Sequence, residues 1–150
     1  MGGNPLQGQL NDIWCFHLFY FTWREITTSG NVVIDARYQA GYTSWNETET
    51  TMFAVFTGIS MARTSNSLFI LNTDAWTWAV QPYQGDLLGA QEDPILTYYS
   101  GYLYMVGGIA TYNANPYASV FFRYNLSSQK WENIKIQIKY LLFSFTPKEL

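Results

Sequence analysis

Few side chains in this 150-residue chain could perform chemistry, and none stands in a recognisable catalytic spacing. His17 is the single histidine and Cys15 the single cysteine. A Ser/His/Asp set would need His17 as its base, but His17 lies in CFHLF, where a turn or core position is the simpler interpretation. One thiol and one imidazole are too few for a convincing metal site. We therefore predict no metal site, and we interpret Cys15 as a small buried hydrophobe.

Carboxylates gather in two places, and both are interpreted as solvated turns. Asp86, Glu92 and Asp93 share one loop, and Glu47 and Glu49 share another. No glycine-rich loop leads into a helix, so phosphate binding has no support. These patterns predict no catalytic residue, no cofactor and no enzymatic activity.

The composition favours strands. Aromatic residues make up 19% of the chain and charged residues 13%, which suits half-buried pleated strands better than amphipathic helices. The net charge of −3 argues against nucleic-acid binding. No stretch is long and apolar enough to cross a bilayer, and the first residues lack the pattern of a signal peptide.

A sequence pattern occurs three times. Its copies are NDIWCFHLFYFTW at 11–23, NSLFILNTDAWTW at 66–78 and SVFFRYNLSSQKW at 119–131. The closing residues Trp23, Trp78 and Trp131 are spaced 55 and 53 residues apart. Glycines stand upstream at similar distances: Gly3, Gly58 and Gly108. A period of about 50 residues that carries several short strands predicts a propeller or a related array.

Each repeat divides into short apolar runs between turn residues. The second repeat predicts strands at 38–44, 51–57, 66–72 and 76–81, and the third at 94–100, 102–107, 119–125 and 130–136. We expect each repeated Trp to lie across its sheet and fill the gap against a neighbouring sheet. Asn72 and Asn125 are predicted to brace the turn between the third and fourth strands.

The third repeat resembles a kelch repeat. YLYMVGG at 102–108, which ends on Gly107 and Gly108, precedes FFRYN and then Trp131, and this order is typical of the family. The second repeat departs from the pattern, because Thr57 replaces the first glycine and Leu71-Asn72 replaces the aromatic-acidic pair. The first repeat has Phe16-His17 there, and Arg37 stands where the family often has Arg. The resemblance covers about residues 2–136.

The resemblance implies an all-β fold, a partial kelch-type β-propeller of the galactose oxidase-like central domain superfamily. Two and a half to three four-stranded antiparallel blades are expected, in a ring that does not close. The predicted repeats are 1–30, 31–85 and 86–136, together one incomplete domain over 1–136, followed by a tail at 137–150. Because the end blades of an open ring expose aromatic faces, we expect a fragment or truncated product of a larger propeller. Its faces would be covered by remaining blades or by self-association.

The predicted binding surface is the rim that carries the long connections, because loops on a rigid scaffold concentrate binding residues. The candidates are Arg63, Tyr83, Tyr112 and Tyr117, since Tyr and Arg favour buried interface contacts. The plainer alternative is that they are ordinary loop residues packing on their own blade. The resemblance implies a non-catalytic scaffold or binding module for a protein partner. Two alternatives stay open: a fragment of a propeller enzyme or carbohydrate-binding protein of the galactose oxidase type, and a remnant that cannot fold alone.

Two N-glycosylation sequons begin at Asn46 and Asn125. Chance yields this number of sequons, and Asn125 also has the predicted turn role. Both fall on the short-turn rim, so glycans there would leave the long-loop rim free. The sequence leaves the cellular compartment open, with a slight lean toward the extracellular side of a parent protein.

Overall fold

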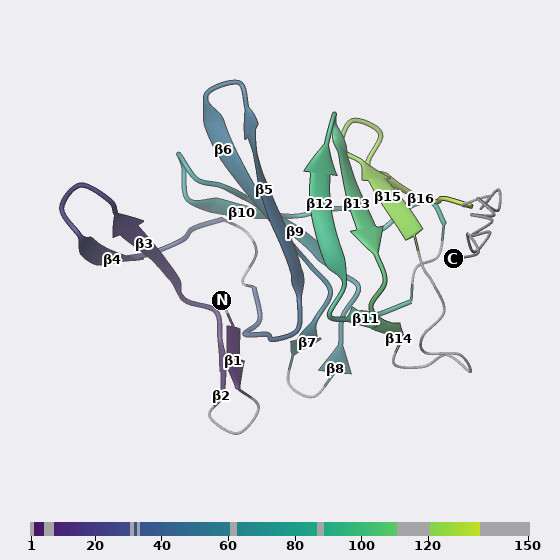
Figure 1. Ribbon diagram of the computed structural model, residues 1–150, viewed down its shortest axis with the longest axis horizontal. Helices are drawn as coiled ribbons and strands as arrows, with labels where there is room; N and C mark the ends of the chain where they lie inside the picture. The colour runs from purple at the N-terminus through teal and green to yellow at the C-terminus, as the bar shows by residue number, and fades with distance from the viewer. Residues whose placement is uncertain are drawn as a thin grey trace, which may run out of the picture.

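The computed structural model describes residues 2–4, 8–30, 32, 34–60, 63–86, 89–110 and 121–135. Within these residues every helix or strand assigned is a strand, so the part described is all-β, as predicted (Figure 1). Two four-stranded antiparallel sheets stand side by side, and a separate hairpin and three short ribbons accompany them. This arrangement is an arc of blades that does not close into a ring.

Sheet A is the first four-stranded sheet. Its strands are β5 (Gly41–Glu47), β6 (Thr50–Phe56), β9 (Leu68–Asn72) and β10 (Thr77–Val80). The spatial order is β10-β9-β6-β5, so consecutive strands are neighbours. Each of these strands overlaps one of the four ranges predicted for the second repeat.

Sheet B repeats the same topology. Its strands are β12 (Ile95–Tyr99), β13 (Tyr102–Val106), β15 (Phe121–Asn125) and β16 (Lys130–Asn133). The spatial order is β12-β13-β15-β16. Buried and less buried residues alternate along β13 and β15, so one face of sheet B is buried against sheet A. The four ranges predicted for the third repeat all overlap these strands.

The first repeat contributes a two-stranded hairpin, which we call the N-terminal hairpin. It consists of β3 (Ile13–His17) and β4 (Thr22–Ile26), and no described strand pairs with the other edge of β3. Three two-stranded ribbons complete the fold. They are β1 (Gly2–Asn4) with β2 (Gly8–Leu10), β7 (Ile59–Ser60) with β8 (Arg63–Thr64), and β11 (Gln91–Glu92) with β14 (Ile109–Ala110).

The main core lies between sheets A and B. Sheet A contributes Trp45, Ala54, Phe56, Leu68 and Ile70, and sheet B contributes Leu96, Leu103, Met105, Phe122, Tyr124 and Trp131. The ring of Trp45 stacks on that of Tyr98, with centroids 5.0 Å apart and planes 11° apart. Aromatic pairs of this kind add about 0.5–1.5 kcal/mol beyond the area they bury, so they fix how the sheets stack.

The other face of sheet A carries a second cluster of buried residues. Val55, Phe69, Leu71 and Trp78 pack there with Ile34, and Ile13 of the N-terminal hairpin lies against them. Sheet A therefore buries side chains on both faces, which is the pattern expected of an inner blade in a stack.

One backbone contact occurs in both sheets. The last strand of each sheet, β10 or β16, is bridged to the chain segment that follows the last strand of the preceding repeat. Ser29 forms a parallel bridge with Thr77, and Gly85 forms the equivalent bridge with Trp131. A Cβ at Gly30, where φ is +122°, would lie 2.7 Å from the carbonyl oxygen of Trp78. At Gly85, where φ is +93°, a Cβ would overlap the carbonyl oxygen of Trp131. Only glycine lets the two backbones approach this closely.

The glycine pair of the kelch pattern has a conformational cause. Gly107 and Gly108 have φ of 69° and 97°, and the equivalent residues Thr57 and Gly58 have φ of 61° and 90°. Position 57 therefore needs the left-handed region even though it carries a β-branched residue, for which this conformation is strained. Thr57 is fully buried, and its Oγ1 has no hydrogen-bond partner in the described part of the chain.

Two expectations about the first repeat are wrong. Trp23 was expected to be buried like its counterparts, but it is 65% exposed, whereas Trp78 and Trp131 are buried. Cys15 was interpreted as a buried hydrophobe, and it is exposed. The two side chains lie on opposite faces of the N-terminal hairpin. Both are exposed because the hairpin has only two strands, and no described strand covers either side chain.

Candidate functional site

The long connections lie at one rim of the arc, opposite the short turns. In Figure 1 the three ribbons β1–β2, β7–β8 and β11–β14 lie at the bottom, while the β5–β6 and β12–β13 turns lie at the top. Each ribbon contains or directly follows one of the repeated glycines: Gly3 lies in β1, Gly58 precedes β7 and Gly108 precedes β14. We call this edge the long-loop rim. It is the surface that sequence analysis proposed for binding.

Hydrogen bonds within the second repeat and between the second and third repeats hold the base of the long-loop rim. The backbone N–H of Gly58 donates to Gln91 O at 3.2 Å, which ties the sheet A repeat to the sheet B repeat. Tyr38 and Ile59 exchange two backbone hydrogen bonds of 3.1 and 2.9 Å. The Asp93 N–H donates to Gln39 O at 2.9 Å. Loops that rise from this base therefore start from fixed positions.

Arg37 is a structural residue beneath this rim. Its side chain is buried, Nη1 donates to the carbonyl oxygen of Thr57 at 2.9 Å, and the guanidinium lies 4.8 Å from the centroid of the Phe69 ring. Burial lowers the pKa of Arg37, and the charge of Asp35 opposes this effect. The same position in the next repeat is Gln91, which is also buried. A residue held in this way supports the strained Thr57 turn and is not offered to a ligand.

The four predicted partner-binding residues are not brought together by the described part of the chain. The backbone of Arg63 lies in β8, at the long-loop rim, and its side chain lies outside the described residues. Tyr83 is half-buried and packs against the main core. Tyr112 and Tyr117 lie outside the described residues. The role of these four in binding stays a prediction.

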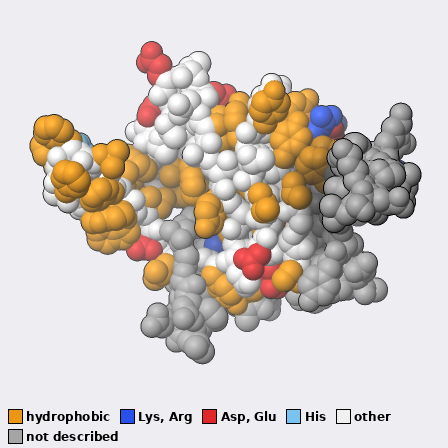
Figure 2. All heavy atoms as spheres, viewed as in Figure 1, with side chains coloured by type: hydrophobic (Ala, Val, Ile, Leu, Met, Phe, Trp, Pro, Cys, Tyr) orange, Lys and Arg blue, Asp and Glu red, His pale blue; other side chains and the backbone are white. Residues whose placement is uncertain are grey.

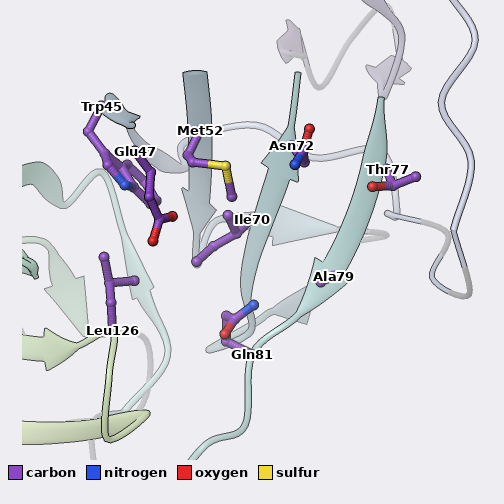
Figure 3. A pocket seen from close by; sticks show the side chains of 9 residues that line it. All are labelled: Trp45, Glu47, Met52, Ile70, Asn72, Thr77, Ala79, Gln81 and Leu126. Carbon is purple, nitrogen blue, oxygen red and sulfur yellow. The ribbon is translucent and has the colours of Figure 1, made fainter. Parts of the chain in front are cut away.

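A hollow of about 250 Å³ opens between sheet A and the turn that follows β15. Figure 3 shows its lining, in which Leu126 faces the hollow from the sheet B side. The lining residues are Trp45, Glu47, Met52, Ile70, Asn72, Thr77, Ala79, Gln81 and Leu126. Their carboxylate, amide and hydroxyl groups can hydrogen-bond a small polar molecule beside the Trp45 indole. One polar atom of the lining already has a structural role, because Oδ1 of Asn72 accepts two backbone hydrogen bonds.

A second hollow of about 320 Å³ separates the N-terminal hairpin from sheet A. It is lined mainly by apolar side chains, with hydroxyls from Ser and Thr. The residues are Ile13, Trp14, Ser44, Thr51, Phe53, Leu71, Thr73 and Trp76.

The turns on the opposite rim are braced as predicted. Asn72 Oδ1 accepts hydrogen bonds from the N–H groups of Asp74 and Ala75 at 3.0 and 2.9 Å. Asn125 Oδ1 accepts from Ser127 and Ser128, both at 2.9 Å. The turn role predicted for the two asparagines is confirmed. These hydrogen bonds use Oδ1 of Asn125 and leave Nδ2, the atom to which an N-glycan is attached, out of the contact. The side chain of Asn46 is exposed.

The described residues hold no group of three or more His, Cys, Asp and Glu side chains placed to bind a metal ion. His17 is exposed at the end of β3, and its Nδ1 accepts a hydrogen bond from the Tyr20 N–H at 3.2 Å. No helix in the described ranges could cross a membrane.

Sequence reasoning missed one repeated feature of the scaffold. Gly30 and Gly85 each stand seven residues after a repeated Trp, and both sit against the backbone of the following repeat's Trp. The spacing was visible in the sequence, and glycine at a fixed distance from a repeated Trp is a sign of close backbone approach.

Comparison with known proteins gives two findings. Residues 1–142 match the family model described as the KLHDC2/KLHL20/DRC7 Kelch-repeats domain. The chain is also similar to a "Kelch domain-containing protein" of Sulfurisphaera tokodaii, with 29% identity over 137 residues. That match covers 90% of this chain and 17% of the relative, so the chain spans about a sixth of the length of that protein.

Proposed function

Because the chain belongs to the kelch-repeat family, we propose that it is a non-catalytic binding module whose long-loop rim engages a protein partner. Kelch-repeat domains are generally propeller scaffolds that bind proteins, and catalysis is not their usual role. The observation that carries the proposal is the placement of three ribbons at one rim, above a base of hydrogen bonds between repeats.

Two physical arguments support this rim over the opposite one. The turns at the opposite rim are short and use their own polar side chains to satisfy backbone N–H groups. The long-loop rim carries longer connections, in which side chains beyond those needed for the turn are available. Arg63, Tyr83, Tyr112 and Tyr117 remain the candidates for contact with the partner. The division into repeats at 1–30, 31–85 and 86–136, with a tail at 137–150, is part of the same proposal.

A phage-displayed random peptide library, selected on the immobilised chain, supplies the probe for this proposal. Peptides that bind are then titrated against a rim variant with Arg63→Ala, Tyr112→Ala and Tyr117→Ala. The matched control replaces exposed residues of the short turns, with Glu49→Ala, Ser127→Ala and Ser128→Ala. Tyr83→Phe is measured separately, because Tyr83 packs against the core.

We expect the rim variant to bind at least about tenfold more weakly, equivalent to about 1.4 kcal/mol, and the control to bind as the wild type does. Circular dichroism confirms that each variant is folded. Equal binding by the rim variant, together with loss of binding in the short-turn control, would overturn the proposal.

A further inference from the structure

The contact between sheets A and B defines what one blade presents to the next. Sheet B buries Phe122, Tyr124 and Trp131 on the face turned toward sheet A. Trp131 and Tyr124 are paired across β15 and β16, with ring centroids 5.1 Å apart. The ring of Phe56, from sheet A, lies 4.5 Å from Trp131 across the interface.

The N-terminal hairpin carries aromatic side chains at the same repeat positions, and they are exposed, although Trp14 also borders the hollow between the hairpin and sheet A. Trp14, Phe16 and Trp23 stand at the repeat positions of Phe122, Tyr124 and Trp131. Phe16 pairs with Trp23 across β3 and β4, and their centroids lie 4.9 Å apart, close to the spacing in the Tyr124–Trp131 pair. Yet Trp14, Phe16 and Trp23 are 50%, 38% and 65% exposed. Figure 2 shows hydrophobic side chains gathered over this hairpin.

The far face of sheet B is the complementary surface. Val106 stands at the repeat position of Phe56, and Tyr99 at that of Trp45, and both are exposed. Among the residues described, this face carries one ion pair, in which Arg123 Nε donates to Glu132 Oε2 at 2.7 Å, so these two charges neutralise each other. The Arg123 guanidinium also lies 4.6 Å from the Tyr102 ring centroid. An aromatic surface can therefore cover the Arg123–Glu132 pair without leaving either of these two charges unpaired.

The two faces also match in size. The face that sheet A turns to a four-stranded neighbour has Met52 and Ala54 on β6, whereas the equivalent residues of β13 are Tyr102 and Tyr104. A neighbour with only two strands leaves more room opposite the inner strands. The larger tyrosines of sheet B suit a two-stranded neighbour such as the N-terminal hairpin.

We infer that two copies of this chain associate head to tail, with the Trp14–Phe16–Trp23 face of each copy packed on the far face of sheet B of the other. Each chain supplies three layers, namely the hairpin, sheet A and sheet B, so two chains supply six. Propellers close with four to eight blades, so a two-copy ring falls within the known range and closes with two identical contacts. The long-loop rim takes no part in this contact and stays free for a partner.

Two complementary variants of the 150-residue chain test this arrangement by sedimentation velocity. Trp23→Asp places a charge in the hairpin face, and Val106→Asp places one in the sheet B face. Each variant alone disrupts both contacts of the ring, so we expect its dimer dissociation constant to rise at least tenfold. An equimolar mixture keeps one intact contact, between Val106 of the first variant and Trp23 of the second. The mixture is therefore expected to form more dimer than either variant alone.

The control is Leu18→Asp, which places the same charge at a still more exposed residue in the turn of the same hairpin. We expect it to leave the dimer intact, because the turn lies outside the paired face. A wild-type chain that stays monomeric at every concentration would overturn the inference. So would dimers that survive both face variants, dissociation by Leu18→Asp alone, or a mixture with no more dimer than the separate variants.

Discussion

The indole of Trp131 lies against the ring of Phe56, with centroids 4.5 Å apart, although the two residues belong to different sheets. Trp131 closes the third copy of the sequence repeat, and Phe56 ends the strand before the glycine position of the second copy. The repeat therefore encodes a contact between blades as well as the strands of each blade.

Trp131→Ala is expected to destabilise the fold by about 3–5 kcal/mol, since truncating a fully buried Trp removes its packing and leaves a cavity between the sheets. Urea unfolding followed by far-ultraviolet circular dichroism measures the change. The control is Trp23→Ala, at the same repeat position, measured at dilution where the chain is monomeric. Because Trp23 is exposed, we expect a change within about 0.5 kcal/mol. Equal losses in the two variants would contradict the assigned burial.

Thr57→Gly is expected to stabilise the protein by about 1 kcal/mol. The change relieves a β-branched residue from a left-handed conformation and removes a buried hydroxyl without a partner in the described residues. Part of the gain is offset by the greater chain entropy of glycine when unfolded.

The reciprocal change, Gly107→Thr, puts the same residue at the equivalent position of the next repeat, and a loss of about 1–2 kcal/mol is expected. Thermal unfolding midpoints should move in opposite directions for the two variants. A lower midpoint for Thr57→Gly would mean that its side-chain packing outweighs the backbone strain.

Gly85→Ala is predicted to cost at least about 2 kcal/mol, because a methyl group would overlap the carbonyl oxygen of Trp131 and the backbone has φ of +93°. Gly89→Ala is the matched control in the same connection. Its nearest heavy atom would be Gln91 Nε2 at 3.9 Å, so the replacement should change stability by less than about 1 kcal/mol. Chemical denaturation of both variants measures the difference. If Gly85→Ala left the free energy of unfolding unchanged, the close approach of the Gly85 backbone to Trp131 of β16 would be contradicted.

Tyr124 should make stability fall at high pH. Burial raises the pKa of Tyr124 to about 12 from an ordinary value of 10.0. The folded state therefore holds the phenol proton more tightly than the unfolded chain does. The stabilisation is complete below about pH 10 and is lost as the pH rises toward about 12, by an amount on the order of 2–3 kcal/mol.

Tyr124→Phe isolates this effect, because the Tyr124 hydroxyl has no hydrogen-bond partner among the described residues. The variant should be at least as stable as the wild type at pH 7 and should show a flatter decline between about pH 10 and 12. Free energies of unfolding measured across this pH range provide the comparison. Parallel curves for the two proteins would show that Tyr124 does not titrate abnormally.

The positions of the strands in sheets A and B were predictable, because short apolar runs between turn residues recur with the period of the Trp residues. The turn roles of Asn72 and Asn125 were also predictable, since a short amide side chain after a strand can accept hydrogen bonds from the following N–H groups. Thr57 shows how far the repeat extends, because a position aligned with glycine keeps its positive φ even when the residue is not glycine.

The exposure of Trp23 was not predictable from its place in the repeat. A side chain is buried only when another surface packs against it. The sequence repeat predicts the face that carries Trp23, but it does not predict whether a second surface covers that face. The burial of Arg37 was missed for a similar reason, because it depends on the carbonyl oxygen of Thr57, 20 residues away in the sequence. The binding candidates Tyr112 and Tyr117 lie outside the described residues, so the loops themselves remain a prediction from the sequence.

The stacking of sheet B on sheet A is the central claim, and a nuclear Overhauser experiment on the isotope-labelled chain tests it most directly. We predict cross-peaks between the indole protons of Trp131 and the ring protons of Phe56, and between the rings of Trp45 and Tyr98. Absence of both sets of cross-peaks in a folded, assigned spectrum would contradict the account.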